Sequence, residues 1–72
     1  MITVDARGHR CPVPTLKLRR ALESADSGER VRLLADDPMA RIDVPHFVAE
    51  NGHKILESDL AGPGLSFTVQ KG

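Results

Sequence analysis

The chain has 72 residues, of which 40% are hydrophobic and 3% aromatic, and its 10 Lys and Arg residues balance its 10 Asp and Glu residues. At this length we expect one domain, residues 1–72, because such a chain buries only about 60% of the surface that its unfolded form exposes. The formal net charge of zero excludes an overall field that recruits nucleic acid or anionic lipid, and no stretch approaches the ~18 apolar residues of a membrane span.

Turn signals divide the chain into six short elements, of which a strand and a helix come first. Ile2 to Asp5 alternates like a strand and ends before Arg7-Gly8. The next segment, from Pro12 or Pro14 to about Ala25, is predicted to be an amphipathic helix. Its apolar residues recur at helical spacing: Leu18, Ala21, Leu22 and Ala25.

A second strand and a second helix follow. Glu29 to Ala35 has the length and the branched residues of a strand, and Asp36-Asp37-Pro38 then supplies a capping carboxylate, expected at Asp37, with proline at the first helical position. Pro45 is expected to interrupt this helix, giving a short turn and a second start near Asp43. The apolar stripe of the segment is Ala40, Val44, Phe47 and Val48, and Asn51-Gly52 ends it.

The last two elements, His53 to Asp59 and Leu65 to Lys71, are predicted to be strands joined in a hairpin through Leu60–Gly64. The helical crossover favours a parallel pairing of the first two strands, whereas the final hairpin must be antiparallel. The predicted fold is an α/β two-layer sandwich of order βαβαββ, with a mixed four-stranded sheet and both helices on one face.

The only cysteine, Cys11, lies between the first strand and the first helix, in the segment HRCPVP. It cannot close an intramolecular disulfide, and no CxxC pair is present. The positive end of the helix dipole and the charge of Arg10 both favour a thiolate there, while Pro12 and Pro14 stiffen the segment. A lone cysteine is more often a small buried hydrophobe, but its flanking residues favour a reactive, presented thiol.

The predicted first helix leaves an unusual surface on its outer side. At ~100° per residue, Val13 and Leu16 project almost opposite the core stripe, beside Lys17 and Arg20. This combination suits a docking patch for an acidic partner, although a solvated helix face with scattered apolar residues is the common alternative.

Two stretches, DARGHRCPVP and LLADDPMARIDVPHF, closely resemble the TusA/SirA-like sulfur-carrier family. CPxP at the first helix start, DDP after the second strand and D-x-P in the second helix form a specific combination. The resemblance implies a sulfurtransferase in which Cys11 accepts a sulfane sulfur as a persulfide and passes it to a cysteine of another protein. We expect it to be cytoplasmic, because Met1 to Asp5 shows no basic region followed by an apolar stretch. It leaves open whether the route is tRNA thiolation, molybdenum-cofactor supply or sulfur oxidation.

The implied partners are a sulfur donor, either a cysteine desulfurase or a rhodanese, and an acceptor protein of a sulfur relay. We expect a monomer that needs no organic cofactor and has no membrane segment. The contact residues proposed for partners are Arg10, Pro12, Val13, Leu16, Lys17 and Arg20. The alternative function is a non-catalytic interaction or regulatory module built on the same fold.

The other polar residues are weaker candidates for a functional role. His9 could act as a base toward Cys11, but residues two apart in a loop need not face each other, so it is left unassigned. His46 and His53 are separated by a helix end, and we expect no metal site. Asp36 is not explained by capping and is a candidate for contact with partners.

Overall fold

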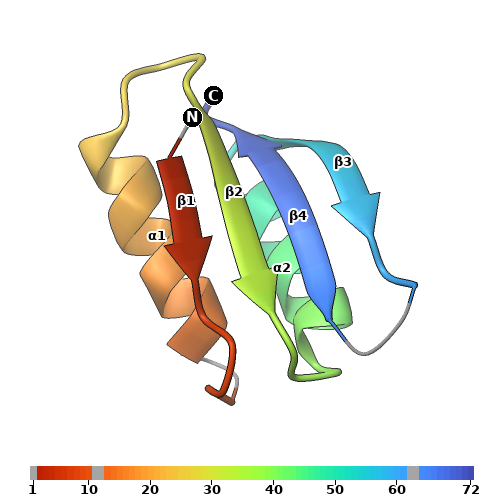
Figure 1. The fold of residues 1–72 in the computed structure, drawn as a ribbon. Helices are drawn as coiled ribbons and strands as arrows, with labels where there is room; N and C mark the ends of the chain where they lie inside the picture. Colours follow the sequence, from red (N-terminus) through yellow and green to blue (C-terminus); the bar gives the residue numbers. More distant parts are fainter. Residues whose placement is uncertain (1, 11–12, 62–63) are drawn as a thin grey trace.

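Four strands and two helices make up the described part of the chain, residues 2–10, 13–61 and 64–72, in a computed structural model (Figure 1). Their order confirms the predicted βαβαββ arrangement. The elements are β1 (Ile2–Asp5), α1 (Val13–Ser24), β2 (Arg30–Ala35), α2 (Ala40–Glu50), β3 (Lys54–Asp59) and β4 (Leu65–Gln70).

The sheet has the strand order β1-β2-β4-β3, so that the last strand of the chain lies between β2 and β3. β1 and β2 are parallel, and β4 is antiparallel to both of its neighbours. Both helices cover the same face of this sheet (Figure 1). The chain is therefore an α/β two-layer sandwich with a mixed sheet, as predicted, and both parallel strands end at the same edge.

The core lies between the sheet and the two helices. Val4 pairs with Leu33 and Leu33 pairs with Phe67, so alternate residues of neighbouring strands face the helices together. Burying these side chains is the main favourable term in folding, at roughly 25 cal/mol per Å² of apolar surface. The buried apolar residues are Ala6, Leu18, Leu22, Ala25, Val31, Leu33, Ala35, Ala40, Val44, Val48, Leu65, Phe67 and Val69.

Helix α1 has the predicted phase. Leu18 and Leu22 are buried, at 0% and 1% exposure, whereas Val13 and Leu16 are exposed at 36% and 49%. The helix runs from Val13 to Ser24, within one residue of the expected end. Whether it begins at Pro12 lies outside the described residues.

Helix α2 differs from the prediction, because Pro45 lies inside one continuous helix instead of separating two. The prediction that Asp37 caps this helix was wrong: its Oδ1 accepts the backbone N–H of Met39 at 2.9 Å in the preceding turn, but the N-cap is Met39, without a side-chain cap hydrogen bond, and the regular helix starts at Ala40. Proline at position 45 has no N–H to donate to the carbonyl of Arg41, which is itself an exposed residue. Three buried side chains on one stripe hold both halves against the sheet: Ala40, Val44 and Val48.

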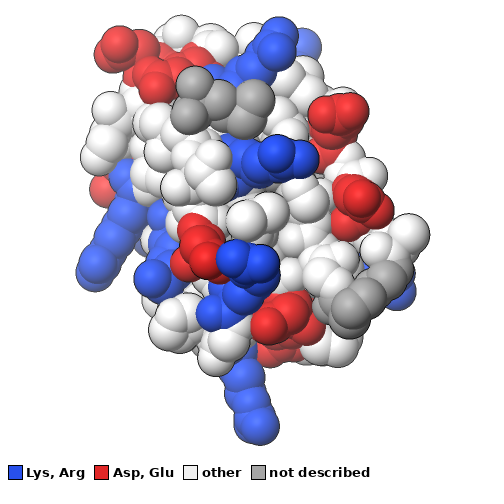
Figure 2. Space-filling view, viewed as in Figure 1, with Lys and Arg blue, Asp and Glu red and all other residues white. Residues whose placement is uncertain are grey.

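The other face of the sheet is open to solvent and polar (Figure 2). Positively charged lysine and arginine side chains and negatively charged carboxylates are interspersed across it. Near its centre, Arg32 on β2 donates from Nε to the Ser66 hydroxyl on β4 at 3.4 Å. The predicted hairpin of β3 and β4 is confirmed, with a register shift between Ile55 and Glu57; residues 62 and 63 of its connection lie outside the described part.

The two leucines of α1 provide a matched test of the helix phase. Leu18→Ala removes a fully buried side chain and should lower the free energy of unfolding by about 2–5 kcal/mol. Leu16→Ala, two residues away on the exposed side, should change it by less than about 0.5 kcal/mol. Urea unfolding followed by circular dichroism measures both, and similar losses in the two variants would show that the helix is rotated from the orientation described.

Candidate functional site

The segment between β1 and α1 carries the predicted reactive cysteine. Cys11 and Pro12 lie outside the described residues, so the site is built from the residues around them. On either side of this pair, the backbone N–H of Val13 donates to the carbonyl of Arg10 at 2.9 Å. This hydrogen bond joins the loop directly to the first residue of the helix.

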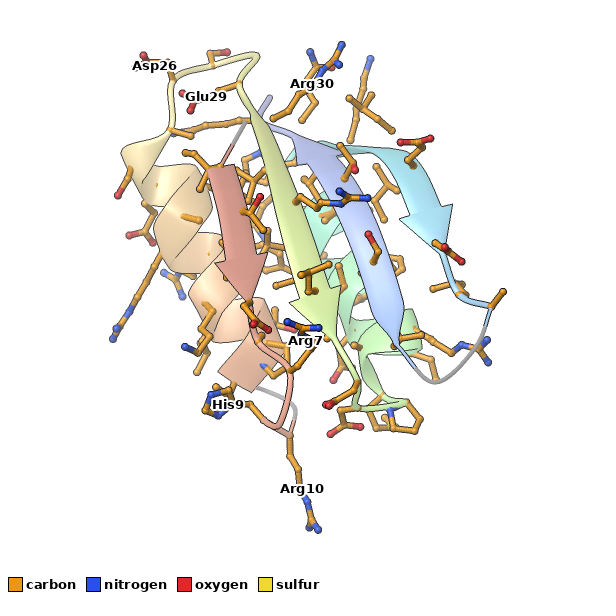
Figure 3. The ribbon with its side chains drawn as sticks, viewed as in Figure 1. Arg7, His9, Arg10, Asp26, Glu29 and Arg30 are labelled. Atoms are coloured by element: carbon orange, nitrogen blue, oxygen red, sulfur yellow. The ribbon has the colours of Figure 1, made fainter. Side chains whose placement is uncertain are left out.

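The start of the loop is held by an ion pair. The Asp5 carboxylate at the end of β1 accepts from Arg7 Nε and Nη2, both at 2.9 Å, and from the Arg7 backbone N–H at 3.1 Å. These hydrogen bonds lower the pKa of Asp5 from 3.8 to about 2 and raise the pKa of Arg7. Figure 3 shows Arg7 lying against the sheet while Arg10 extends away from it.

The middle of the loop is held from the neighbouring strand. The backbone N–H of Gly8 lies 3.0 Å from both carboxylate oxygens of Asp36, the residue that follows β2. Gly8 has a φ of +83°, a left-handed conformation that glycine adopts without strain. Asp36, which sequence reasoning left without a structural role, thus contacts the loop that leads to Cys11.

The loops that follow β1 and β2 form a shallow depression. One wall consists of Gly8, His9 and Arg10, and the other of Asp36, Asp37 and Pro38. This adjacency follows from the parallel pairing of β1 with β2, since parallel strands end at the same edge of a sheet. The sequence signal for it was the helical crossover together with polar residues directly after each of the two strands.

Four of the predicted partner-contact residues come together on the outer side of α1. Val13, Leu16, Lys17 and Arg20 line one groove, with the apolar residues nearest the helix start. The neighbouring Arg19 is engaged elsewhere, because its Nε donates to Glu23 at 3.1 Å. Arg10 belongs to the depression between the loops instead, and Pro12 lies outside the described residues.

The histidines lie in separate surroundings. His9 is exposed in the loop, and His46 pairs with Glu50 at 3.1 Å one turn along α2. His53 accepts the backbone N–H of Gly72 on Nδ1 at 3.0 Å. Among the residues that the structure describes, no group of three or more histidine, cysteine or carboxylate side chains is placed to hold a metal ion. Within the same residues, neither helix is long and apolar enough to cross a membrane.

The fold and this loop place the chain in a class of small βαβαββ sandwiches with a cysteine segment between the first strand and the first helix. Residues 2–71 match the family described as "Sulfurtransferase TusA", and the chain belongs to this family. The resemblance predicted from the two sequence stretches is confirmed.

Individual relatives agree with this assignment. The chain is 39% identical over 61 residues to a "Putative sulfur carrier protein" of Thermotoga maritima, covering 85% of this chain and 77% of the relative. It is 38% identical over 71 residues to a protein of the same name from Archaeoglobus fulgidus, covering 97% and 92%. The crystal structure of a SirA-like protein from Desulfitobacterium hafniense superposes with a TM-score of 0.85 at 28% identity, covering 100% of this chain and 99% of that one. The family and these names support a sulfur-carrier role that involves partners of a sulfur relay.

The pKa of Asp5 makes the ion pair at the loop start testable. Because the folded protein holds this pKa near 2, below 3.8, the pair stabilises the fold above about pH 4, and this stabilisation is lost as the pH falls through 2. NMR titration of the Asp5 carboxyl should give a midpoint near 2 in the wild type, and Arg7→Gln should move it toward 3.8. A wild-type midpoint already near 3.8 would mean that the pair does not persist in solution.

Proposed function

We propose that Cys11 carries a sulfane sulfur as a persulfide and relays it between two partner proteins. The observation that carries this proposal is the presence of the single cysteine in the CPxP segment of a TusA-family chain. Two contacts support it, because the described residues before Cys11 are anchored to β1 through Asp5 and to the end of β2 through Asp36. An anchored loop presents a reactive group in a defined direction.

The chemistry is a thiol exchange without net oxidation or reduction. The Cys11 thiolate attacks the terminal sulfur of a persulfide on the donor, a cysteine desulfurase or a rhodanese. The sulfur–sulfur bond of the donor breaks, its cysteine thiolate leaves, and the terminal sulfur remains on Cys11 as a persulfide anion. In the second step an acceptor thiolate attacks that terminal sulfur and releases the Cys11 thiolate.

The absence of a second cysteine in the sequence suits a carrier. A neighbouring thiol within the same chain could attack Cys11 Sγ itself, forming a disulfide with Cys11 while the terminal sulfur leaves as hydrosulfide. With one cysteine this loss has no intramolecular route. The cargo therefore leaves only through an external thiol, which is the property that a relay between proteins requires.

We further propose that partners dock on the outer side of α1. Val13 and Leu16 supply apolar contact beside the cysteine segment, and Lys17 and Arg20 supply positive charge along the same groove. An acidic partner surface would be steered toward the groove by these charges and would then bury the two aliphatic side chains. Arg10, with its side chain directed away from the sheet, is the cation nearest in sequence to Cys11 and completes the proposed contact set (Figure 3).

The relay role is tested by mass spectrometry of the intact protein. After incubation with a cysteine desulfurase and cysteine, or with a rhodanese fed thiosulfate, the reduced protein should gain the mass of one sulfur atom and lose it on treatment with reductant. Cys11→Ser should gain nothing, because the sequence contains no other thiol. Equal loading of Cys11→Ser would falsify the relay role, and no loading of the wild type by either donor would favour the interaction module.

The docking surface is tested by reversing its charges. Lys17→Glu with Arg20→Glu should slow sulfur transfer on the order of tenfold at low ionic strength and weaken its dependence on salt, because electrostatic steering acts on association. The matched control is Arg30→Glu with Lys54→Glu, an equal change of charge at the exposed starts of β2 and β3, away from the loop. Equal slowing in both double variants would point to net charge, and unchanged transfer in the first would move docking to another surface.

A further inference from the structure

The contact between Asp36 and Gly8 joins two segments that are 28 residues apart in the chain, and it lies three residues before Cys11. Asp36 is exposed, and it does not cap α2, whose N-cap is Met39. The pairing of the two parallel strands does not need this side chain, because the strands are already paired up to Asp5 and Leu34. Its partner is instead the loop itself.

Asp36 extends the pairing of β1 and β2 by one hydrogen bond. In the last backbone–backbone hydrogen bond between these segments, the Ala6 N–H donates to the Leu34 carbonyl at 2.8 Å. The next donor in line on this side of the loop is the N–H of Gly8, and both oxygens of the Asp36 side chain receive it at 3.0 Å. A carboxylate side chain thus takes the place that a backbone carbonyl would hold in a longer strand.

The loop has little else to fix it at this point. Its own turn is closed by a long hydrogen bond, from the His9 N–H to the Ala6 carbonyl at 3.3 Å. A hydrogen bond to an ionised acceptor is roughly twice as strong as one between neutral groups, so the contact with Asp36 is the stronger of the two. The left-handed conformation of Gly8 reverses the chain here, and the direction of the segment toward Cys11 depends on where this residue is held.

We propose that Asp36 is a positioning residue for sulfur transfer: by holding the N–H of Gly8, it sets the direction in which the Cys11 segment meets a partner protein. This inference rests on the proposed relay function. Transfer between two proteins requires the attacking sulfur to approach in line with the sulfur–sulfur bond while both backbones are constrained by docking. A small reagent in solution has no such constraint, because it can approach the thiolate from any open side.

Comparing sulfur transfer between proteins with alkylation by a small reagent therefore separates an effect on positioning from an effect on the reactivity of the thiol. Asp36→Ala should reduce the maximal rate of transfer from a persulfide-loaded donor protein on the order of tenfold, since small misplacements of reacting groups are costly, and leave the half-saturating donor concentration unchanged. Its alkylation by iodoacetamide, measured at a pH where the thiol is fully ionised, should match the wild type. Asp36→Asn keeps an oxygen acceptor for Gly8 and should restore most of the transfer rate.

Two controls accompany these variants. Asp59→Ala also removes a hydrogen bond from a backbone N–H to a carboxylate, in this case from Ala61 to Asp59 Oδ1 at 3.2 Å. This contact lies after β3, the edge strand farthest from β1, so the variant should transfer sulfur at the wild-type rate. Amide hydrogen exchange at Gly8, followed by NMR, should show lost protection in Asp36→Ala and retained protection in Asp36→Asn. Urea unfolding verifies that each variant is folded under the assay conditions.

Each result decides the question. Wild-type transfer by a folded Asp36→Ala variant that has lost protection at Gly8 overturns the positioning role and leaves the relay intact. Equal losses in alkylation and in transfer also overturn it, because Asp36 would then act on the reactivity of the thiol. If the wild type itself takes up no sulfur, the relay function fails, and the positioning role fails with it.

Discussion

The parallel pairing of β1 with β2 is the constraint on which the rest of the site depends. It brings the ends of both strands, and therefore the loops that lead into α1 and α2, to one edge of the sheet. Without it, nothing would bring together Asp36 and Gly8, which are separated by 28 positions in the sequence. The same pairing places the starts of the two helices at that edge, so the positive ends of both helix dipoles lie on the side of the cysteine segment.

In this chain of 72 residues, the interior and the loops at the site are held by different interactions. The interior is filled by small and branched side chains around the fully buried Phe67, on the strand that lies between β2 and β3, with Phe47 packed partly buried against them. This leaves the loops outside the core, where they cannot be held by burial of apolar surface. Their order comes instead from hydrogen bonds to carboxylates at strand ends, Asp5 for Arg7 and Asp36 for Gly8. Such contacts fix direction at little cost in core volume.

Most of the fold could be predicted from the sequence because its signals are local. Strand alternation and turn residues located every strand to within one residue, and the 3.6-residue period placed Leu18 inside and Leu16 outside. The prediction that Pro45 interrupts the helix was wrong because it considered only local backbone preferences. Val44 before the proline and Val48 after it are both buried against the sheet, and this packing keeps the helix continuous. The contact of Asp36 with Gly8 could not be predicted, since it depends on the register of two strands and on a left-handed glycine. The role proposed for Cys11 rests on several motifs in combination, none of which is specific alone.

Helix α1 carries the buried core residues on one side and the proposed docking groove on the other. Its inner side packs through Leu18 and Leu22, which leave almost no surface to solvent, while the groove of Val13, Leu16, Lys17 and Arg20 contributes little to the core. If the groove is the docking surface, as proposed, substitutions in it can alter the choice of partner with small effects on folding, because exposed positions away from caps rarely change stability by more than about 0.5 kcal/mol. The loop before the helix has no such freedom, since Gly8 must keep a positive φ and an acceptor must remain at residue 36. In the proposed relay, substitutions in the groove can thus change which protein receives the sulfur, while the direction in which the loop holds Cys11 stays the same.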